Sequence, residues 1–263
     1  MIHRTNMVER DAESWRPISF SSGGTRIQSL VFLARRLLDL QTASIWADVS
    51  AELPNVHGTA VDAGCGAQPF RSLFPSDVRY IGIDTSAAEA RFGYAVPDTI
   101  YYESAIWPLP DGSADFVLCT ETLEHVLDAR GFLEQAARCL VPDGRILLTV
   151  PFSARWHYIP FDYWRFTPSS LAHLLAEAGF DKVQVYARGN QVTVACYKLM
   201  ALILPLLAPQ GKNALLGVIL RLFGVLLLPA FAILAVIGNI SLHGKGGDDC
   251  LGYTVKAQRM GKA

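Results

Sequence analysis

The sequence predicts an α/β protein with a seven-stranded, mostly parallel sheet, helices on both faces, and an apolar helical insertion before the last strand. Short apolar runs separated by turns begin at residue 56 and are typical of buried strands. Helical patterns lie between these runs, and strands that alternate with helices indicate a parallel sheet covered on both sides. A glycine turn follows the first run, at the edge where open α/β sheets bind ligands.

The N-terminal part of the chain predicts a polar arm followed by one helix. Residues 1–24 are polar and end in a Ser-Ser-Gly-Gly run. Thr25 and Gln28 then fit the capping box T-x-x-Q, which satisfies the first amides of a helix. Apolar residues continue at helical spacing to Val49, so we expect this helix to end before Pro54.

Seven strands and four further helices complete the predicted fold. The strands are expected at residues 56–63, 78–84, 99–103, 114–120, 145–151, 182–188 and 250–258. The helices are expected at residues 68–74, 85–92 and 127–140, and from Pro168 to Ala178 with Thr167 as N-cap and Gly179 after the end. A Pro-Asp-Gly turn at residues 142–144 is expected to precede the fifth strand.

The composition argues against several classes of protein. Hydrophobic residues make up 51% and charged residues 18% of the chain, so intrinsic disorder is excluded. The net charge is −1 and no basic stripe occurs, so we expect no nucleic-acid partner. Five cysteines without a C-x-x-C pair argue against a disulfide framework or a structural zinc site and suit a reducing compartment. No metal-ligand cluster is apparent in the sequence, so we expect a metal-independent reaction. We expect the catalytic part in the cytoplasm, because residues 1–24 lack the apolar core of a secretory signal.

Two glycines and two acids give the strongest functional signal. Gly64 and Gly66 follow the first predicted strand, and without side chains they let a ligand approach the backbone closely. Asp62, at the end of that strand, can accept hydrogen bonds from a cationic group above the turn. Asp84 ends the second strand, where an acid can bind both hydroxyls of a ribose. The pattern therefore predicts a nucleotide-like ligand.

Two later motifs identify a family. The third strand ends at residues 103–105, Glu-Ser-Ala, where an acid and backbone amides suit the border of a purine. Residues 109–117 read LPDGSADFV, and residues 123–126 read LEHV. With the D-x-G-C-G turn and Asp84, these motifs resemble those of the class I S-adenosylmethionine-dependent methyltransferases over roughly residues 56–188. The resemblance implies a Rossmann-like methyltransferase fold and S-adenosylmethionine as cofactor.

The resemblance also implies which residues surround the cofactor, at the carboxyl ends of four strands. They are Asp62, Gly64, Cys65 and Gly66 at its methionine part, Asp84 at the ribose, Glu103, Ser104 and Ala105 at the adenine, and Thr120 and Glu121 at the sulfonium. One departure from the family pattern is a missing third glycine, since residues 67–69 read Ala-Gln-Pro. We expect cofactor binding to survive this change and the following helix to start differently.

Residues 151–166 are expected to bind the acceptor. This segment follows the fifth strand and is rich in aromatic side chains, with one histidine, one aspartate and two arginines. His157 is the first candidate for a general base and Asp162 the second. The expected substrate contacts are Arg155, Tyr158, Tyr163, Arg165 and His125. The alternatives are that the aromatics cap the sheet, that Asp162 and Arg165 form a structural ion pair, and that His125 orients the loop.

Residues 196–242 are predicted to dock on a membrane. They carry only three charges, Lys198, Lys212 and Arg221, and residues 210–213 divide them into two apolar parts. If the sixth and seventh strands are neighbours, both ends of the segment lie on one side, so a re-entrant or interfacial hairpin is expected. The alternatives are a homodimer interface through this segment, or residues 191–197 pairing as a strand and leaving one crossing.

These observations together predict four segments and a function. The segments are a polar arm at 1–24, a methyltransferase core at 25–195, an apolar insertion at 196–245, and the final strand and tail at 246–263. The expected activity is methyl transfer to a small or lipid- or glycan-linked acceptor, as O-methylation at the cytoplasmic face of a membrane. One alternative is a nicotinamide-dependent oxidoreductase, which Pro69 disfavours because G-x-G-x-x-G requires glycine there. Another is a non-catalytic, cofactor-binding membrane scaffold.

Overall fold

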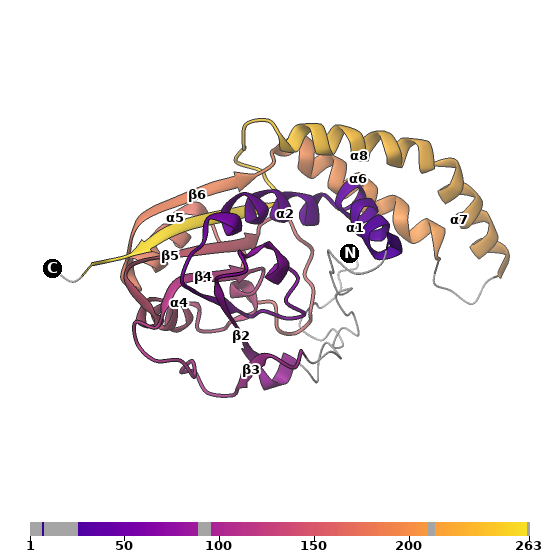
Figure 1. Cartoon of the computed structure of the whole chain (residues 1–263). Helices are drawn as coiled ribbons and strands as arrows, with labels where there is room; N and C mark the ends of the chain where they lie inside the picture. The colour runs from indigo at the N-terminus through magenta and orange to yellow at the C-terminus, as the bar shows by residue number, and fades with distance from the viewer. Residues whose placement is uncertain (1–6, 8–25, 89–95, 210–213, 262–263) are drawn as a thin grey trace. The chain divides into compact units, whose positions relative to one another are not determined.

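The computed structural model describes residue 7 and residues 26–88, 96–209 and 214–261. Seven strands form one sheet in the order β3-β2-β1-β4-β5-β7-β6 (Figure 1), as predicted. Their bounds are Thr59–Ala63 for β1, Arg79–Thr85 for β2, Thr99–Tyr102 for β3, Ala114–Thr120 for β4, Leu140–Pro151 for β5, Phe180–Arg188 for β6 and Gly252–Arg259 for β7.

The first five strands run parallel. β1 pairs with β2 on one side and with β4 on the other, so the strand order reverses between β1 and β4. A ligand crevice opens at such a reversal, outside the carboxyl ends of the strands. β7 runs antiparallel to β6, because Leu251 N donates to Arg188 O and Met260 N donates to Gly179 O at their opposite ends. The sheet is therefore mixed, with its ligand edge set by β1, β2 and β4.

The central strands carry the hydrophobic core of the sheet. Five of the seven β4 residues are buried, and β5 is buried without a break from Ile146 to Pro151. Parallel strands covered on both faces need such continuous apolar runs. The apolar pattern of the sequence therefore identified these strands correctly.

The described helices are seven α-helices and three short 3-10 helices. The α-helices are α1 (Arg26–Leu38), α2 (Leu40–Glu52), α4 (Ala129–Cys139), α5 (Pro168–Glu177), α6 (Gln191–Leu207), α7 (Ala214–Leu226) and α8 (Leu228–Leu242). The 3-10 helices are η1 (Leu53–Asn55), η2 (Arg71–Leu73) and η3 (Leu123–His125).

The chain divides into two compact units. The first, here the core unit, contains Pro54–Val185 and Val255–Ala263, and the second, the helical unit, contains Ser21–Leu53 and Tyr186–Thr254. The helical unit is larger than the predicted insertion at 196–245, since it includes α1 and α2. The four-segment division of the sequence itself stays a prediction.

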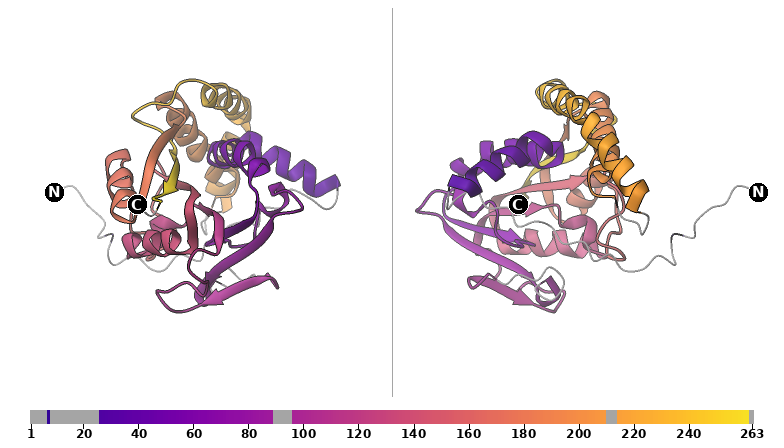
Figure 2. Two further views of the ribbon diagram at one scale, coloured as in Figure 1. Left: turned by 60° about the vertical axis from the view of Figure 1, so that its left-hand side comes forward. Right: turned by 90° about the vertical axis from the view of Figure 1, so that its right-hand side faces the viewer.

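Within the helical unit, α6 and α8 lie side by side (Figure 2). Leu40 of α2, Met200 of α6 and Phe231 of α8 belong to one buried cluster. Gly238 permits the close approach of α8 to α2, because a Cβ there would lie 2.4 Å from Leu40 Cδ1. This unit therefore has an apolar core of its own.

The insertion starts and ends at one point. Gly247 N donates to Gly189 O at 3.1 Å, one residue before Asn190, which caps α6. The Asn190 amide also donates to Ser241 O and Lys245 O. The predicted adjacency of β6 and β7 is confirmed, and the alternative in which residues 191–197 form a strand is wrong, because they form the first turns of α6.

Several predicted helices differ from the structure. The single helix expected from Thr25 is two helices, because Asp39 breaks it and caps α2 by accepting a hydrogen bond from Thr42 N. Thr25 itself lies outside the described residues. The helix expected at 68–74 is reduced to η2, since Gln68 has a left-handed φ of 53° that an α-helix does not allow.

Two further expectations need qualification. The turn at 142–144 lies inside β5 rather than before it, with Asp143 left-handed at φ 63° and a register shift against β4. Of the helix expected at 85–92, residues 86–88 are helical and residues 89–92 lie outside the described part. Neither difference alters the predicted number of strands.

The predicted ends of α5 are confirmed. Thr167 accepts a hydrogen bond from Ser170 N, the Ser170 hydroxyl accepts one from Thr167 N, and Pro168 is the first helical residue. Gly179 follows the C-cap with φ 94°, a conformation in which glycine carries little penalty. Local sequence signals therefore fix this helix.

We expect Thr167→Ala to lower the free energy of unfolding by about 1 kcal/mol, because it removes the acceptor for Ser170 N. Guanidinium denaturation measures the change. Ser169→Ala is the matched control, since Ser169 is exposed on the same helix and alanine is the better helix former. Equal midpoints for Thr167→Ala and Ser169→Ala would contradict the capping role.

Candidate functional site

The glycine turn after β1 is held against β2. Gly64 and Gly66 have left-handed φ values of 73° and 51°. Gly64 N and Cys65 N both donate to Ile83 O, at 2.9 and 3.2 Å. A Cβ on Gly64 would lie 2.2 Å from Thr122 Cγ2, so the residues after β4 approach the turn as closely as its backbone permits. Gly64 is thus required both by its conformation and by its neighbour.

Asp84 lies beside the turn, as predicted. Its Oδ2 accepts a hydrogen bond from Gly66 N at 2.9 Å, and its Oδ1 accepts one from Thr85 N at 2.7 Å. Burial raises the pKa of Asp84, and these two backbone bonds act in the opposite direction. A carboxylate has about four acceptor sites, so this one keeps the capacity to bind two hydroxyls.

Asp62 is buried under the turn and paired with a residue that sequence reasoning missed. Its Oδ2 accepts a hydrogen bond from the Tyr80 hydroxyl at 2.7 Å. Burial raises the pKa of Asp62 to about 7, with the Tyr80 bond opposing this shift and Asp84 adding to it. The Asp62 charge is therefore sensitive to pH near neutrality. No motif signals Tyr80, because it is an ordinary strand residue in sequence.

Gln68 stands directly before Pro69, the residue found where the third glycine is missing. The left-handed backbone of Gln68 continues the turn, and its Nε2 donates to Thr99 Oγ1 at 2.9 Å. Its Oε1 accepts from Arg71 at 3.0 Å. Cys65 Sγ lies 3.6 Å from the same Thr99 hydroxyl, and burial raises the pKa of the Cys65 thiol. Cys65 is therefore a packing residue of the turn and a poor nucleophile.

The segment expected at the adenine follows β3. Glu103, Ser104 and Ala105 are all exposed, and the Ser104 hydroxyl donates to Ile106 O at 2.7 Å. They lie after the strand that neighbours β2, so their position relative to the sheet matches the expectation. Their role toward a ligand stays a prediction.

The end of β4 reaches the glycine turn. Thr120 is its last residue, and Glu121 follows with a left-handed φ of 48° while its N donates to Thr149 O at 3.0 Å. Thr122 then turns toward Gly64, and its hydroxyl lies 3.0 Å from Thr120 O and 3.4 Å from Gly64 O. The two predicted residues thus lie next to the turn, held there by Thr122.

Residues 151–166 are anchored on η3. Tyr163 N and Trp164 N donate to Glu124 O at 2.9 and 3.3 Å, and Trp164 Nε1 donates to Val126 O at 2.9 Å. His125 Nδ1 lies 2.8 Å from Phe161 O. The fold therefore brings the segment after β5 against the segment after β4, as the topology of a parallel sheet requires.

Asp162 holds two of the predicted residues. Its Oδ1 and Oδ2 accept hydrogen bonds from Nη1 and Nη2 of Arg165, at 2.6 and 2.7 Å. Its Oδ2 also lies 3.0 Å from His157 N and from His157 Nδ1. Burial alone would raise the pKa of Asp162, but the Arg165 and His157 bonds outweigh it and hold the pKa well below its usual range. Asp162 is thus a weak base whose structural action is to position His157.

The remaining predicted contacts differ in exposure. Tyr158 has a left-handed φ of 53°, and its ring centroid lies 5.2 Å from that of His125. Tyr163 is 41% exposed and Arg155 is exposed, with its Nη1 donating to Trp156 O. His125, Tyr158 and His157 are therefore brought together, whereas Tyr163 and Arg155 face outward on the same loop.

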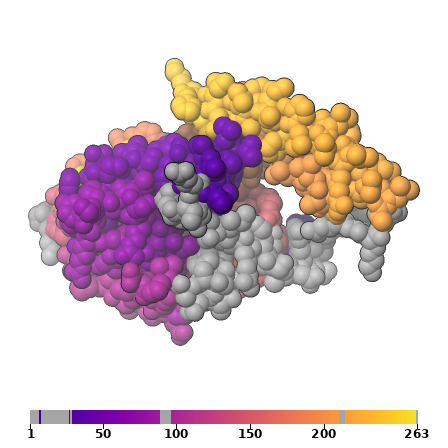
Figure 3. Space-filling view, turned by 45° about the vertical axis from the view of Figure 1, so that its right-hand side comes forward, coloured from indigo at the N-terminus to yellow at the C-terminus, as the bar shows by residue number. Residues whose placement is uncertain are grey.

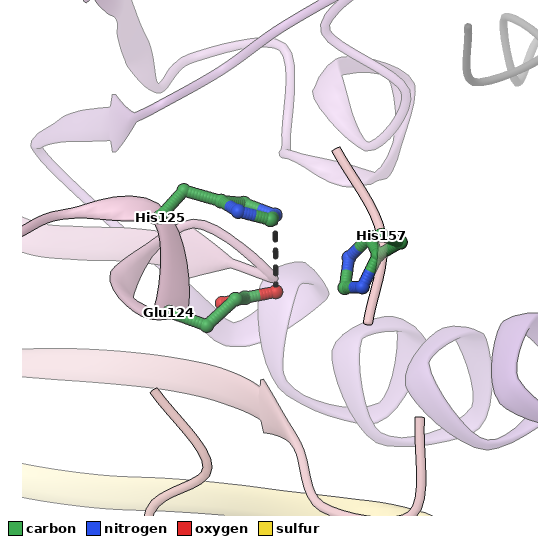
Figure 4. Close-up of side chains that lie close together, drawn as sticks. All are labelled: Glu124, His125 and His157. Carbon is green, nitrogen blue, oxygen red and sulfur yellow. Dashed lines mark ion pairs between the residues drawn. The ribbon is translucent and has the colours of Figure 1, made fainter. Parts of the chain in front are cut away.

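Glu124 joins this group, although the sequence analysis gave it no role. Glu124, His125 and His157 each offer a ligand-type atom, and these atoms lie within 4.8 Å of one another (Figure 4). Burial raises the pKa of the Glu124 carboxyl well above its usual range and lowers that of His125 to about 4. Glu124 stands beside His125 in sequence, but His157 is far from both, so spacing alone did not reveal the cluster.

Comparison with known proteins identifies the fold and the domain. A family model described as a methyltransferase domain matches residues 35–185. A crystal structure of an S-adenosylmethionine-dependent methyltransferase from Archaeoglobus fulgidus aligns with a TM-score of 0.51 at 17% identity, covering 87% of this chain and 99% of that one. At this identity the structural match establishes the fold.

Curated relatives match a third to a half of the chain. A probable S-adenosylmethionine-dependent methyltransferase of Mycolicibacterium smegmatis is 31% identical over 137 residues, 46% of this chain and 51% of that protein. A 27-O-demethylrifamycin SV methyltransferase of Amycolatopsis mediterranei is 35% identical over 99 residues, 34% of this chain and 36% of that protein. The chain thus spans about half of the first relative's length and about a third of the second's.

We expect Gly64→Ala to destabilise the protein by ~1–3 kcal/mol more than Gly112→Ala, because only the first Cβ meets another side chain. Both glycines have left-handed φ values, 73° and 58°, so the conformational strain is matched, and a Cβ on Gly112 meets nothing within 4 Å. Denaturant unfolding measures both variants. Thr122→Ala in the Gly64→Ala background should recover part of the loss, and equal losses for the two glycine variants would refute the steric argument.

Proposed function

The chain belongs to the class I S-adenosylmethionine-dependent methyltransferases, and we propose that it transfers a methyl group to an acceptor bound by residues 151–166. S-adenosylmethionine is the cofactor, and when bound it supplies a methyl group activated on a sulfonium. Since the chain matches only part of its relatives, the activity is proposed from the site itself.

The observation that carries this proposal is the contact of Asp84 with the glycine turn. The acid at the end of β2 and the amide of Gly66 are 2.9 Å apart, so a diol on Asp84 and an amino-acid group on the turn fit one ligand. Asp62 adds a buried acid beside the same turn, which suits an ammonium group. Carboxylates are the acceptors that the ribose diol and the ammonium group of a sulfonium nucleoside amino acid require.

The acceptor is proposed to be a hydroxyl on a small or lipid- or glycan-linked molecule. The similarity to the relative named as a 27-O-demethylrifamycin SV methyltransferase supports the proposal of an oxygen acceptor. His157 sits in the acceptor loop beside His125, with ring centroids 5.0 Å apart, and is the proposed general base. Arg155 is exposed on the same loop and suits an anionic group of the acceptor.

The exposed apolar surface of the helical unit supports the proposal that the protein acts at a membrane surface. Large apolar side chains are exposed on α6, α7 and α8, among them Leu202 at 70%, Leu226 at 73% and Ile240 at 69%. Figure 3 shows the surface of these helices, coloured orange to yellow. Soluble monomers rarely expose so large an apolar surface. No single described helix is long and apolar enough to span a membrane. Together, α7 and α8 reach the length and apolar composition of a span, but they are bent by 48° at their junction. We propose an interfacial or re-entrant attachment at the cytoplasmic face, consistent with five cysteines that are all buried free thiols.

The nicotinamide-dependent alternative is not favoured. Pro69 stands where dinucleotide-binding turns place their third glycine, and the side chain of the preceding Gln68 donates to Thr99. A non-catalytic scaffold would share the cofactor site and differ only in turnover. Incubation with radiolabelled S-adenosylmethionine and extracted lipids and glycans separates this outcome from catalysis.

We expect Asp84→Ala to weaken S-adenosylhomocysteine binding roughly 10–100-fold or more, because each hydrogen bond to a charged acceptor contributes about 1.5–3 kcal/mol. Isothermal titration calorimetry measures the affinity. Asp98→Ala is the matched control, as this exposed carboxylate pairs only with Arg71 among its described contacts, at 3.0 Å. Unchanged affinity in Asp84→Ala, or equally tight binding of NAD by the wild type, would overturn the assignment.

We expect Leu226→Asp to abolish most binding to vesicles of phosphatidylcholine and phosphatidylglycerol, because it places a charge on the exposed apolar face of α7. Vesicle flotation measures the bound fraction. Ile106→Asp is the control, since Ile106 is 63% exposed in the core unit. If the wild type forms a stable dimer in light scattering and does not bind vesicles, the exposed apolar face is a dimer interface and the membrane proposal is wrong.

A further inference from the structure

Three metal-ligand side chains converge beside the acceptor loop. Glu124 and His125 lie on η3 after β4, and His157 lies in the segment after β5 (Figure 4). Their ligand-type atoms are within 4.8 Å of one another. Two imidazoles and one carboxylate form a recurrent donor set for first-row divalent ions. The proposed methyl transfer gives this set no role as a unit.

Glu124 provides the second observation. Its side chain is fully buried, and within the described chain neither carboxyl oxygen has a hydrogen-bond partner. Burying an unpartnered carboxyl is costly, so such a group calls for an occupant beside it. Its Oε1 lies 3.6 Å from His125 Nε2, too long for a hydrogen bond. Two atoms that bind one tetrahedral ion at about 2.1 Å lie about 3.4 Å apart, which matches this separation.

The two imidazoles are held in the way that metal-binding histidines usually are. His125 Nδ1 lies 2.8 Å from Phe161 O, and His157 Nδ1 lies 3.0 Å from Asp162 Oδ2. A neutral ring that donates through Nδ1 carries its lone pair on Nε2. Ligating histidines almost always donate their other nitrogen to a carbonyl or a carboxylate. Arg165 fixes Asp162 in turn through two short bonds, so the orientation of His157 is built into the fold.

We propose that Glu124, His125 and His157 bind a first-row divalent transition-metal ion such as Zn²⁺ or Co²⁺. Two imidazole ligands favour these ions over Mg²⁺ and Ca²⁺, which prefer oxygen ligands. Three protein ligands leave at least one coordination position open. The site can be tested without methyl transfer, but its ion would occupy Nε2 of His157, which then cannot act as the proposed general base. The proposed ion also replaces the expectation of a metal-independent reaction drawn from the sequence.

The test uses the full chain without a histidine tag, stripped with EDTA and titrated with Co²⁺ while the visible absorption is recorded. We expect one saturable ion per chain, displaced by Zn²⁺ and not by millimolar Mg²⁺. His125→Ala and His157→Ala should each weaken Co²⁺ binding roughly 100-fold or more, since even supporting residues contribute about 10–100-fold. Melting curves in EDTA establish that the variants are folded, and the wild-type Co²⁺ spectrum serves as the test if one variant is not.

His173→Ala is the matched control. His173 Nε2 lies 3.6 Å from Glu177 Oε1, the same separation as in the Glu124–His125 pair, but on the exposed surface of α5. It should bind Co²⁺ as the wild type does. Absence of Co²⁺ binding by the wild type, or an equal loss in His173→Ala, overturns the site. Titration of the metal-free wild type with S-adenosylhomocysteine separates the two proposals. If this ligand binds but Co²⁺ does not, only the ion site is wrong. If Co²⁺ binds but this ligand does not, only the cofactor assignment is wrong.

Discussion

The close approach of Gly64 to Thr122 organises the whole functional edge of the sheet. Because Gly64 has no Cβ, the residues that leave β4 pack directly on the turn that leaves β1. Thr122 leads into η3, whose Glu124 carbonyl receives two backbone amides of the loop after β5. The glycine turn thus contacts the residues that lead into η3, and η3 in turn holds the loop after β5. A side chain at Gly64 would therefore displace both η3 and the loop.

Charge in this region is dominated by buried acids. Burial raises the pKa values of Asp62, Asp84 and Glu124, so all three are less readily ionised than free carboxyls. Asp162 is the exception, since Arg165 pairs with it through both guanidinium nitrogens. A region of this kind favours cationic ligands, because a positive charge restores the ionised state of the carboxyls that surround it. A sulfonium, an ammonium and a metal ion share that property.

The sequence predicted the sheet better than the helices. The pattern of apolar residues located all seven strands, and it did so most directly for β4 and β5, because buried parallel strands need continuous apolar runs. It joined α1 and α2, because the cap at Asp39 interrupts the chain without interrupting the apolar pattern. The proximity of Gly64, Gly66 and Asp84 was predicted correctly because all three follow strand ends at one edge of the sheet, and their roles toward the cofactor stay a prediction. Tyr80 and the Glu124–His157 association were missed because they depend on packing between segments distant in sequence.

The junction of Gly189 with Gly247 has a consequence for how this chain tolerates change. The hydrogen bond between their backbones means that β6 and β7 meet at almost the same point whatever lies between them. The entropy of closing a loop grows only slowly with its length, so three helices cost the strand pairing little more than a short hairpin would. The length and composition of the segment between Gly189 and Gly247 can therefore differ between related chains, while the register of β6 and β7 stays fixed.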